Sequence, residues 1–140
     1  MTEKTWKATL DYFGLEGQVA IVTGAGNGIG EATATMLANL GAKVAVCDIE
    51  IARAERVAQN ITNCGGTAIA VACDVGSQEQ IERAVEEVAA QLGSIDILVN
   101  NAAGFGGGKT LDQVDLKEWD RLIHLNPVSY THLTLPTTSR

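Results

Sequence analysis

Short apolar runs alternate along this chain with segments in which apolar residues recur every three or four positions. The spacing predicts helices between residues 29–40, 54–61, 81–92 and 116–123, and glycines at 41, 65, 66 and 93 end the first three. Four buried strands are predicted at Val19–Val22, Val44–Cys47, Ala68–Ala72 and Ile95–Val99. Strands that alternate with helices through short turns predict an α/β fold, a parallel sheet of order 3-2-1-4 with helices on both faces.

Two finer features of the helices follow from the same pattern. The first helix is expected to bury one apolar face, made of Ile29, Ala32, Thr33, Met36, Leu37 and Leu40. Capping boxes are expected at the start of the third helix, from Ser77 with Gln80, and of the fourth, from Asp115 with Glu118.

A glycine-rich segment, Thr23–Gly30, joins the first strand to the first helix. A helix N-terminus has unpaired N–H groups and partial positive charge, so a pyrophosphate can bind there where no side chain blocks its approach. Gly24 and Gly28 would supply the turn and the close approach, and Gly30 would let the helix pack tightly on the strand. Glycines also serve plain turns, but the strand before and the helix after favour a dinucleotide site.

Asp48 ends the second strand, where a carboxylate can accept hydrogen bonds from both hydroxyls of the adenosine ribose. It would repel a 2′-phosphate, and Asn27 in the glycine loop is uncharged, so we expect NAD as the cofactor in preference to NADP. Capping of the next helix is a second, compatible role for Asp48. Asp74 and Val75 end the third strand and either bracket the adenine ring or merely precede a helix; these two readings stay open.

With Thr23-Gly24-x-x-x-Gly28-Ile29-Gly30, Asp48, Asp74-Val75 and Asn100-Asn101-Ala102 in place, residues 15–126 resemble the short-chain dehydrogenase/reductase family. The resemblance implies a Rossmann-like, NAD(P)-dependent oxidoreductase of alcohols and ketones that forms homodimers or homotetramers. By position it assigns cofactor binding to Gly24, Asn27, Gly28, Ile29, Gly30, Asp48, Asp74, Val75, Asn100 and Ala102. It also makes Asn126 the family's structural and proton-relay asparagine, a catalytic role.

The chain departs from the family pattern at two places. Ala103 stands where the family usually has glycine, which crowds the cofactor slightly. The catalytic serine and Tyr-x-x-x-Lys of the family have no counterpart, because Tyr130 is followed four residues later by Thr134. We therefore expect an NAD-dependent dehydrogenase of a secondary alcohol or ketone as the parent protein, and an inactive 140-residue chain. The alternatives are a non-catalytic dinucleotide-binding or sensor module and a nucleoside-binding methyltransferase, which would lack Asn100-Asn101-Ala102.

The pattern of the chain changes after Asn126. Val128–Thr137 resembles a translated adaptor from a transposase-based sequencing library. We expect residues 1–126 to form the NAD(P)-binding domain and residues 127–140 to be a non-native tail. The alternative is a genuine, extended C-terminus.

Composition narrows the possible partners. The net charge of −7 argues against nucleic acid and anionic membranes as partners, both of which need a basic face. The three cysteines form no CxxC pair, which argues against a disulfide framework and a metal site and favours free thiols. The first residues lack the apolar run of a signal peptide, so we expect a cytoplasmic protein whose partner is a small-molecule substrate.

Overall fold

The computed structural model describes residues 14–104 and 115–128. Strands and helices alternate from the first strand to the fourth, as the apolar pattern predicts. In chain order the elements are β1 (Val19–Thr23), α2 (Gly28–Asn39), β2 (Lys43–Asp48), α3 (Ile51–Asn63), β3 (Thr67–Ala72), α4 (Gln78–Leu92), β4 (Ile97–Val99), α5 (Leu116–Ile123) and the π-helical turn η2 (His124–Val128).

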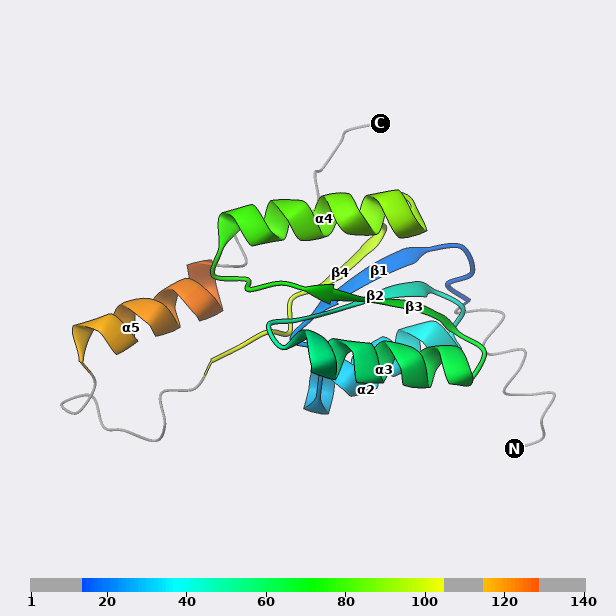
Figure 1. Ribbon diagram of the computed structural model, residues 1–140, viewed down its shortest axis with the longest axis horizontal. Coiled ribbons are helices and arrows are strands. Elements are labelled where there is room, and N and C mark those ends of the chain that lie inside the picture. Colours follow the sequence, from blue (N-terminus) through cyan, green and yellow to red (C-terminus); the bar gives the residue numbers. More distant parts are fainter. Residues whose placement is uncertain (1–13, 105–114, 129–140) are drawn as a thin grey trace.

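The four strands form one parallel sheet of order β3-β2-β1-β4, which confirms the predicted α/β topology. The register sets Ala20 of β1 opposite Val44 of β2 and Ile97 of β4. Helix α4 lies over one face of the sheet, and α2 and α3 lie over the other (Figure 1). Helix α5 lies beyond the end of the sheet toward which the strands point, where loops from several strands meet.

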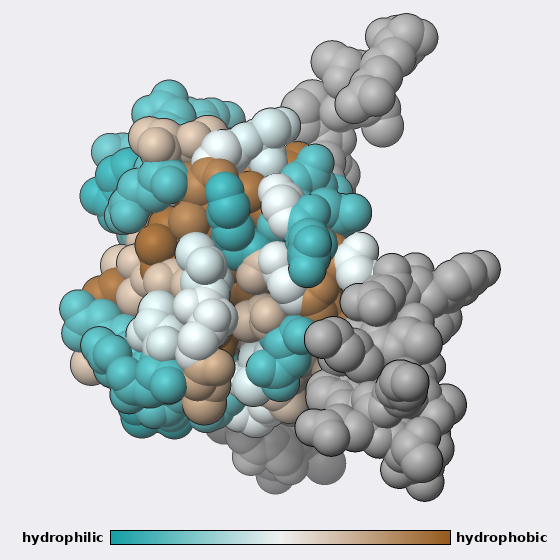
Figure 2. Space-filling view, turned by 90° about the vertical axis from the view of Figure 1, so that its right-hand side faces the viewer, coloured by the Kyte–Doolittle hydropathy of each residue, from teal (hydrophilic) through white to brown (hydrophobic). Residues whose placement is uncertain are grey.

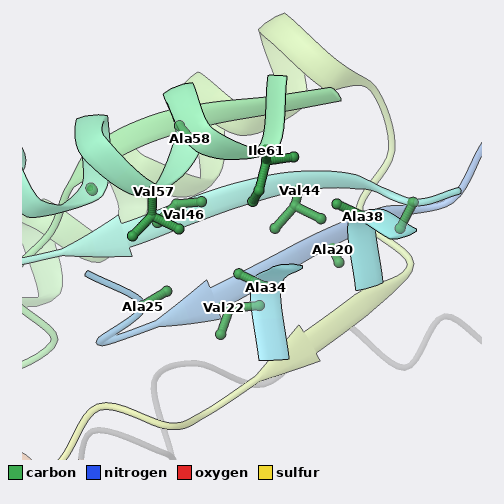
Figure 3. Close-up of a cluster of buried hydrophobic side chains, with 12 residues drawn as sticks. Ala20, Val22, Ala25, Ala34, Ala38, Val44, Val46, Val57, Ala58 and Ile61 are labelled. Carbon is green, nitrogen blue, oxygen red and sulfur yellow. The ribbon is translucent and has the colours of Figure 1, made fainter. Parts of the chain in front are cut away.

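Two apolar cores result from the alternation of side chains along β1 and β2. Ala20 and Val22 of β1 belong to the core under α2 and α3, whereas Val19 and Ile21 belong to the core under α4. In Figure 3 the α3 side chains Val57 and Ile61 lie against β2. Seen from the side opposite α5, apolar residues lie between hydrophilic residues at the top and bottom of the molecule (Figure 2).

The buried face of α2 was predicted wrongly for most of its residues, although Leu37 is partly buried and packs against the core as expected. Gly30, Ala34 and Ala38 are its buried residues, while Ile29 is 81% exposed and Met36 is 61% exposed. Small residues at every fourth position let the helix axis approach the sheet more closely than a row of Ile, Met and Leu side chains would. By contrast, the predicted face of α3 is confirmed, since Ala54, Val57, Ala58 and Ile61 are all buried.

The fourth strand begins at Ile97, two residues later than predicted. The side chain of Asp96 is the reason, because its Oδ2 accepts the Val19 N–H at 2.9 Å. The Asp96 N–H in turn donates to the Val19 carbonyl at 2.9 Å. The Val19 N–H therefore bonds to the Asp96 side chain and not to a backbone carbonyl of β4. This bond fixes the position at which β1 and β4 start to pair.

The predicted helix caps are partly as expected. Ser77 Oγ accepts the Gln80 N–H at 3.4 Å, and Asp115 Oδ1 accepts the Glu118 N–H at 2.8 Å. In the first capping box the Gln80 side chain was also expected to accept the Ser77 N–H. This was wrong, because Gln80 Oε1 instead accepts the Asp74 N–H at 3.1 Å. Gln80 therefore ties α4 to the end of β3, near the cleft described below.

The helical backbone continues across the predicted boundary at residue 126, since η2 includes Pro127 and Val128. Pro127 has no N–H for the ordinary bond to the fourth residue before it, and the turn is widened there. The rest of the predicted tail lies outside the described residues, as do Tyr130 and the glycine run after Gly104. Of the helices in the described ranges, none is both long and apolar enough to cross a bilayer.

Candidate functional site

A cleft of about 610 Å³ opens at the carboxyl end of the sheet. Seven of the residues predicted to bind a cofactor share its lining. They are Gly24, Asn27, Ile29, Asp48, Asp74, Val75 and Ala102. Ligands of open parallel sheets bind at this edge, in the crevice where the strand order reverses, here between β1 and β4.

The loop from β1 to α2 makes two turns that only glycine adopts easily. Gly24 has φ +62° and Gly28 has φ +55°, both in the left-handed region. A Cβ on Gly24 would also lie 2.8 Å from Ala102 Cα, so the loop runs directly against the segment after β4. Asn27 precedes α2 in extended conformation and its side chain makes no capping hydrogen bond. The first N–H groups of α2 therefore have no side-chain cap from Asn27 and are available to an anion.

Gly30 has the packing role that the sequence predicts. It is buried in the first turn of α2, and a Cβ there would overlap the carbonyl oxygen of Gly24. The same Cβ would lie 2.5 Å from Asn101 Nδ2 and 2.9 Å from Ala25 Cα. The absence of a side chain thus lets the helix start lie against the loop that precedes it.

Asp48 is buried at the end of β2, with 7% of its surface exposed. Its Oδ2 accepts the Gly26 N–H at 2.8 Å and its Oδ1 accepts the Glu50 N–H at 3.0 Å. The second bond lies just before α3, so the compatible structural role is present. Each carboxylate oxygen has two lone pairs, so one on each remains for a ligand in the cleft.

Thr23 and Asn101 hold the two central strands where they separate. The buried Thr23 Oγ1 donates to the Val99 carbonyl at 3.4 Å and accepts the N–H groups of Asn101 and Ala102, each at 3.1 Å. Asn101 Nδ2 donates to the carbonyls of Thr23 and Gly24 at 3.0 and 3.1 Å. These bonds fix the floor of the cleft. Thr23 was not predicted as a site residue, whereas Asn101 lies in the stretch from Asn100 to Ala102 that the family resemblance expects to stabilise the sheet.

The end of β3 forms the opposite wall. Val75 is buried, and Asp74 Oδ1 accepts the Gly76 N–H at 2.9 Å. The helix-entry role of Asp74 is therefore present, and both residues also line the cleft. Cys73 lines it too, and burial raises the pKa of its thiol to about 11.

Asn126 lies beside the cleft rather than in its lining. Its Oδ1 accepts the Gly104 N–H at 3.0 Å and its Nδ2 donates to the Gly104 carbonyl at 3.1 Å. This pair of bonds joins η2 to the segment after β4. Asn100 is half-buried at the end of β4, and Ala103 lines the cleft where the family has glycine.

Sequence reasoning also missed further residues of this region. Ile49, Arg53 and Arg121 line the cleft, and Gly26 is buried beneath Asp48. A Cβ on Gly26 would lie 2.6 Å from Arg53 Cβ and 2.7 Å from Asp48 Oδ2. Gly26 stands at an unspecified position of the Gly24-x-x-x-Gly28-Ile29-Gly30 motif, and Arg53 is an exposed residue of a helix. Nothing in the sequence therefore marked either of them as a site residue. In the described residues no cluster of three or more His, Cys, Asp or Glu could hold a metal ion.

A cleft with a glycine loop, an uncapped helix start and a carboxylate at the end of β2 fits a dinucleotide. A family model described as short chain dehydrogenase matches residues 18–138, a range that extends past the predicted domain boundary. The chain therefore belongs to the short-chain dehydrogenase/reductase family of oxidoreductases, with an NAD(P)-binding Rossmann fold.

Individual members of the family are similar to this chain over most of its length. It is 40% identical over 124 residues to a 7α-hydroxysteroid dehydrogenase of Escherichia coli (strain K12), a match that covers 89% of this chain and 48% of the relative. A solved 7α-hydroxysteroid dehydrogenase complexed with NADH and 7-oxo glycochenodeoxycholic acid has a TM-score of 0.82 and 40% identity, covering 87% of this chain and 47% of that one.

A metagenomic short-chain oxidoreductase in complex with NADP is similar as well. It has a TM-score of 0.80 and 39% identity, over 85% of this chain and 54% of that one. The chain thus spans about half the length of the relatives it matches. Both forms of the nicotinamide cofactor occur among these similar structures.

Proposed function

We propose that this chain is the NAD-binding part of a dehydrogenase that interconverts a secondary alcohol and a ketone. The observation that supports this most is the buried Asp48 carboxylate, which lines the same cleft as the glycine loop at the start of α2. One group suits the hydroxyls of a ribose and the other suits a pyrophosphate, and a dinucleotide carries both.

The chain's own residues divide the binding of the cofactor among them. The first N–H groups of α2, next to Gly28, Ile29 and Gly30, would hold the pyrophosphate. Asp48 would hold the adenosine ribose, and Asp74 with Val75 would lie beside the adenine. Asn100 and Ala102 would stabilise the segment beside the nicotinamide ribose. When bound, the nicotinamide supplies hydride exchange with the substrate carbon.

The preference for NAD over NADP rests on Asp48. A 2′-phosphate at this ribose would lie close to a carboxylate and carries between about one and a half and two negative charges, so at about 4 Å the repulsion is about 1.5–2 kcal/mol even in bulk water. Arg53 is a cation in the same cleft, but its guanidinium pairs with Glu50 Oε1 at 2.9 Å. We therefore expect discrimination against NADP of at least about tenfold.

The remaining assignments extend this proposal. Asn126 is assigned its catalytic role as the family's proton-relay asparagine, with the Gly104 bonds holding its amide in place. The whole enzyme is proposed to be a cytoplasmic homodimer or homotetramer acting on a small-molecule alcohol or ketone. The 140-residue chain has no Tyr-x-x-x-Lys, so it should bind the cofactor without oxidising an alcohol.

Calorimetric titration of the full chain with NAD⁺ and with NADP⁺ tests the proposal. The wild-type chain should bind NAD⁺ at least about tenfold more tightly. Asp48→Asn should bring the two dissociation constants to within about threefold of each other, because it removes the charge that repels the 2′-phosphate.

Glu55→Gln is the matched control for Asp48→Asn. Glu55 is an exposed acid of α3, so this variant makes the same change of net charge outside the cleft and should leave the ratio of the two constants unchanged. Equal affinity of the wild-type chain for both cofactors would refute the role of Asp48. Absence of binding to either would refute the proposed function altogether.

A further inference from the structure

The first turn of α2 contains an acid, Glu31, at the helix end that faces the cleft. A carboxylate there stabilises the helix, because it interacts favourably with the partial positive charge of the N-terminus. The same carboxylate opposes a pyrophosphate, which binds at that N-terminus with its own negative charges. The proposed function therefore places an unfavourable charge beside its ligand.

Arg56 of α3 lies against this acid. Its Nη1 donates to Glu31 Oε1 at 2.9 Å and its Nη2 donates to Glu31 Oε2 at 2.8 Å, so the pair is bidentate. This hydrogen bonding lowers the pKa of Glu31 below its ordinary value, with charge attraction to Arg56 acting in the same direction. Glu31 is thus ionised at neutral pH, and its charge is balanced by a cation from another helix.

A third hydrogen bond directs Arg56 toward the glycine loop. Its Nη2 also donates to the Gly26 carbonyl at 2.8 Å, while the Gly26 N–H donates to Asp48. Both polar groups of this buried residue are therefore held by side chains that come from β2 and α3. The bond to Gly26 keeps the guanidinium beside the loop, where it can offset the charge of Glu31 for a ligand at the start of α2.

We propose that Arg56 is a charge-balancing residue of the diphosphate site, which neutralises Glu31 so that the α2 N-terminus accepts a dinucleotide. This inference rests on the proposed function and deepens it. An Arg56–Glu31 pair that only held α2 and α3 together would not have the following consequence. Loss of Arg56 should weaken the binding of phosphates, whereas loss of the Glu31 charge should strengthen it.

Titrations of the full chain with ADP and with adenosine separate these cases, because only ADP carries the diphosphate. Arg56→Gln should weaken ADP binding about fivefold and change adenosine binding less than twofold. Glu31→Gln should strengthen ADP binding about twofold, and adding it to Arg56→Gln should restore most of the lost affinity. Arg56→Lys retains the cation and should stay within about twofold of the wild type.

Lys43→Gln is the control for net charge, because Lys43 begins β2 at the edge of the sheet opposite the cleft and does not line the cleft. It should leave both ligands unaffected at the salt concentration of a physiological buffer. Circular dichroism at the titration temperature confirms that each variant is folded. Arg56 and Glu31 are on the surface, so the comparison does not depend on a core substitution.

Two results would overturn the inference. If Arg56→Gln and Glu31→Gln both weaken ADP binding, the pair acts only by holding α2 and α3 together. If Arg56→Gln weakens adenosine and ADP equally, its effect does not involve the phosphates. In both cases the wild-type chain still binds ADP and the proposed function stands. If the wild-type chain binds neither ligand, the proposed function fails and the role of Arg56 fails with it.

Discussion

Replacement of Gly30 by alanine is the smallest perturbation that tests the packing of α2 on its preceding loop. The added methyl group would lie 2.5 Å from Asn101 Nδ2 and 2.9 Å from Ala25 Cα, whereas ordinary contact begins at 3.4 Å. It would also overlap the Gly24 carbonyl oxygen. Two of these three neighbours are backbone atoms, and the overlap with the Gly24 carbonyl oxygen requires the helix start to move away by about 1 Å.

The size of the effect is a difference of two contributions. Overpacking of this kind costs about 3 kcal/mol where the neighbours cannot rotate away. Alanine is favoured over glycine inside a helix by about 1 kcal/mol, which offsets part of that cost. The free energy of unfolding should therefore fall by about 2 kcal/mol, and the Tm of a domain of this size should fall by about 8 °C.

Thermal and urea unfolding followed by circular dichroism measure both quantities. Ala32→Gly is the matched control, because Ala32 is an exposed residue of the same helix and reports the intrinsic propensity alone. It should lose about 1 kcal/mol without any contact being changed. A Gly30→Ala chain that is as stable as the wild type, or more stable, would show that the close approach does not exist.

Two further predictions concern the floor and the wall of the cleft. Thr23→Val should lower the free energy of unfolding by about 2 kcal/mol in a urea titration, because the Ala102 N–H loses its acceptor; Thr23→Ser keeps the hydroxyl and should lose less than half as much. Of the three thiols, exposed Cys64 should react first with a thiol reagent at pH 8, since burial raises the pKa of Cys47 and of Cys73. Peptide mass spectrometry identifies the modified cysteine, and labelling of Cys47 before unfolding would contradict this order.

The topology was predictable because each strand is an apolar run between two helices. β1 is buried at every position, and its side chains alternate between two cores, so a continuous apolar run was the correct signal. Asp48 was predictable for a similar reason, since a carboxylate after such a run must lie at the carboxyl edge of the sheet. The sequence therefore identified the edge at which the cleft opens.

The errors arise where side chains replace backbone partners or where small residues replace large ones. The start of β4 was wrong because the Asp96 carboxylate takes a bond of the ladder, which no periodicity records. The inner face of α2 was wrong because hydrophobicity ranks Ile29 and Met36 above Gly30, whereas close packing favours the glycine. Arg56 was missed because its partners, Glu31 and Gly26, are 25 and 30 residues away in sequence.

Asp48 constrains any attempt to redesign the cofactor preference. The same carboxylate accepts the Gly26 N–H on one oxygen and the Glu50 N–H on the other, so an apolar replacement leaves both donors without their acceptor, and asparagine keeps an acceptor oxygen for one of them. An unsatisfied buried donor costs about 1–3 kcal/mol, a large share of the stability of a small domain. Variants that bind NADP in place of NAD would therefore have a lower free energy of unfolding than the wild type. A thermostabilised background would remain folded despite this loss. Directed evolution of this position should be started from such a background.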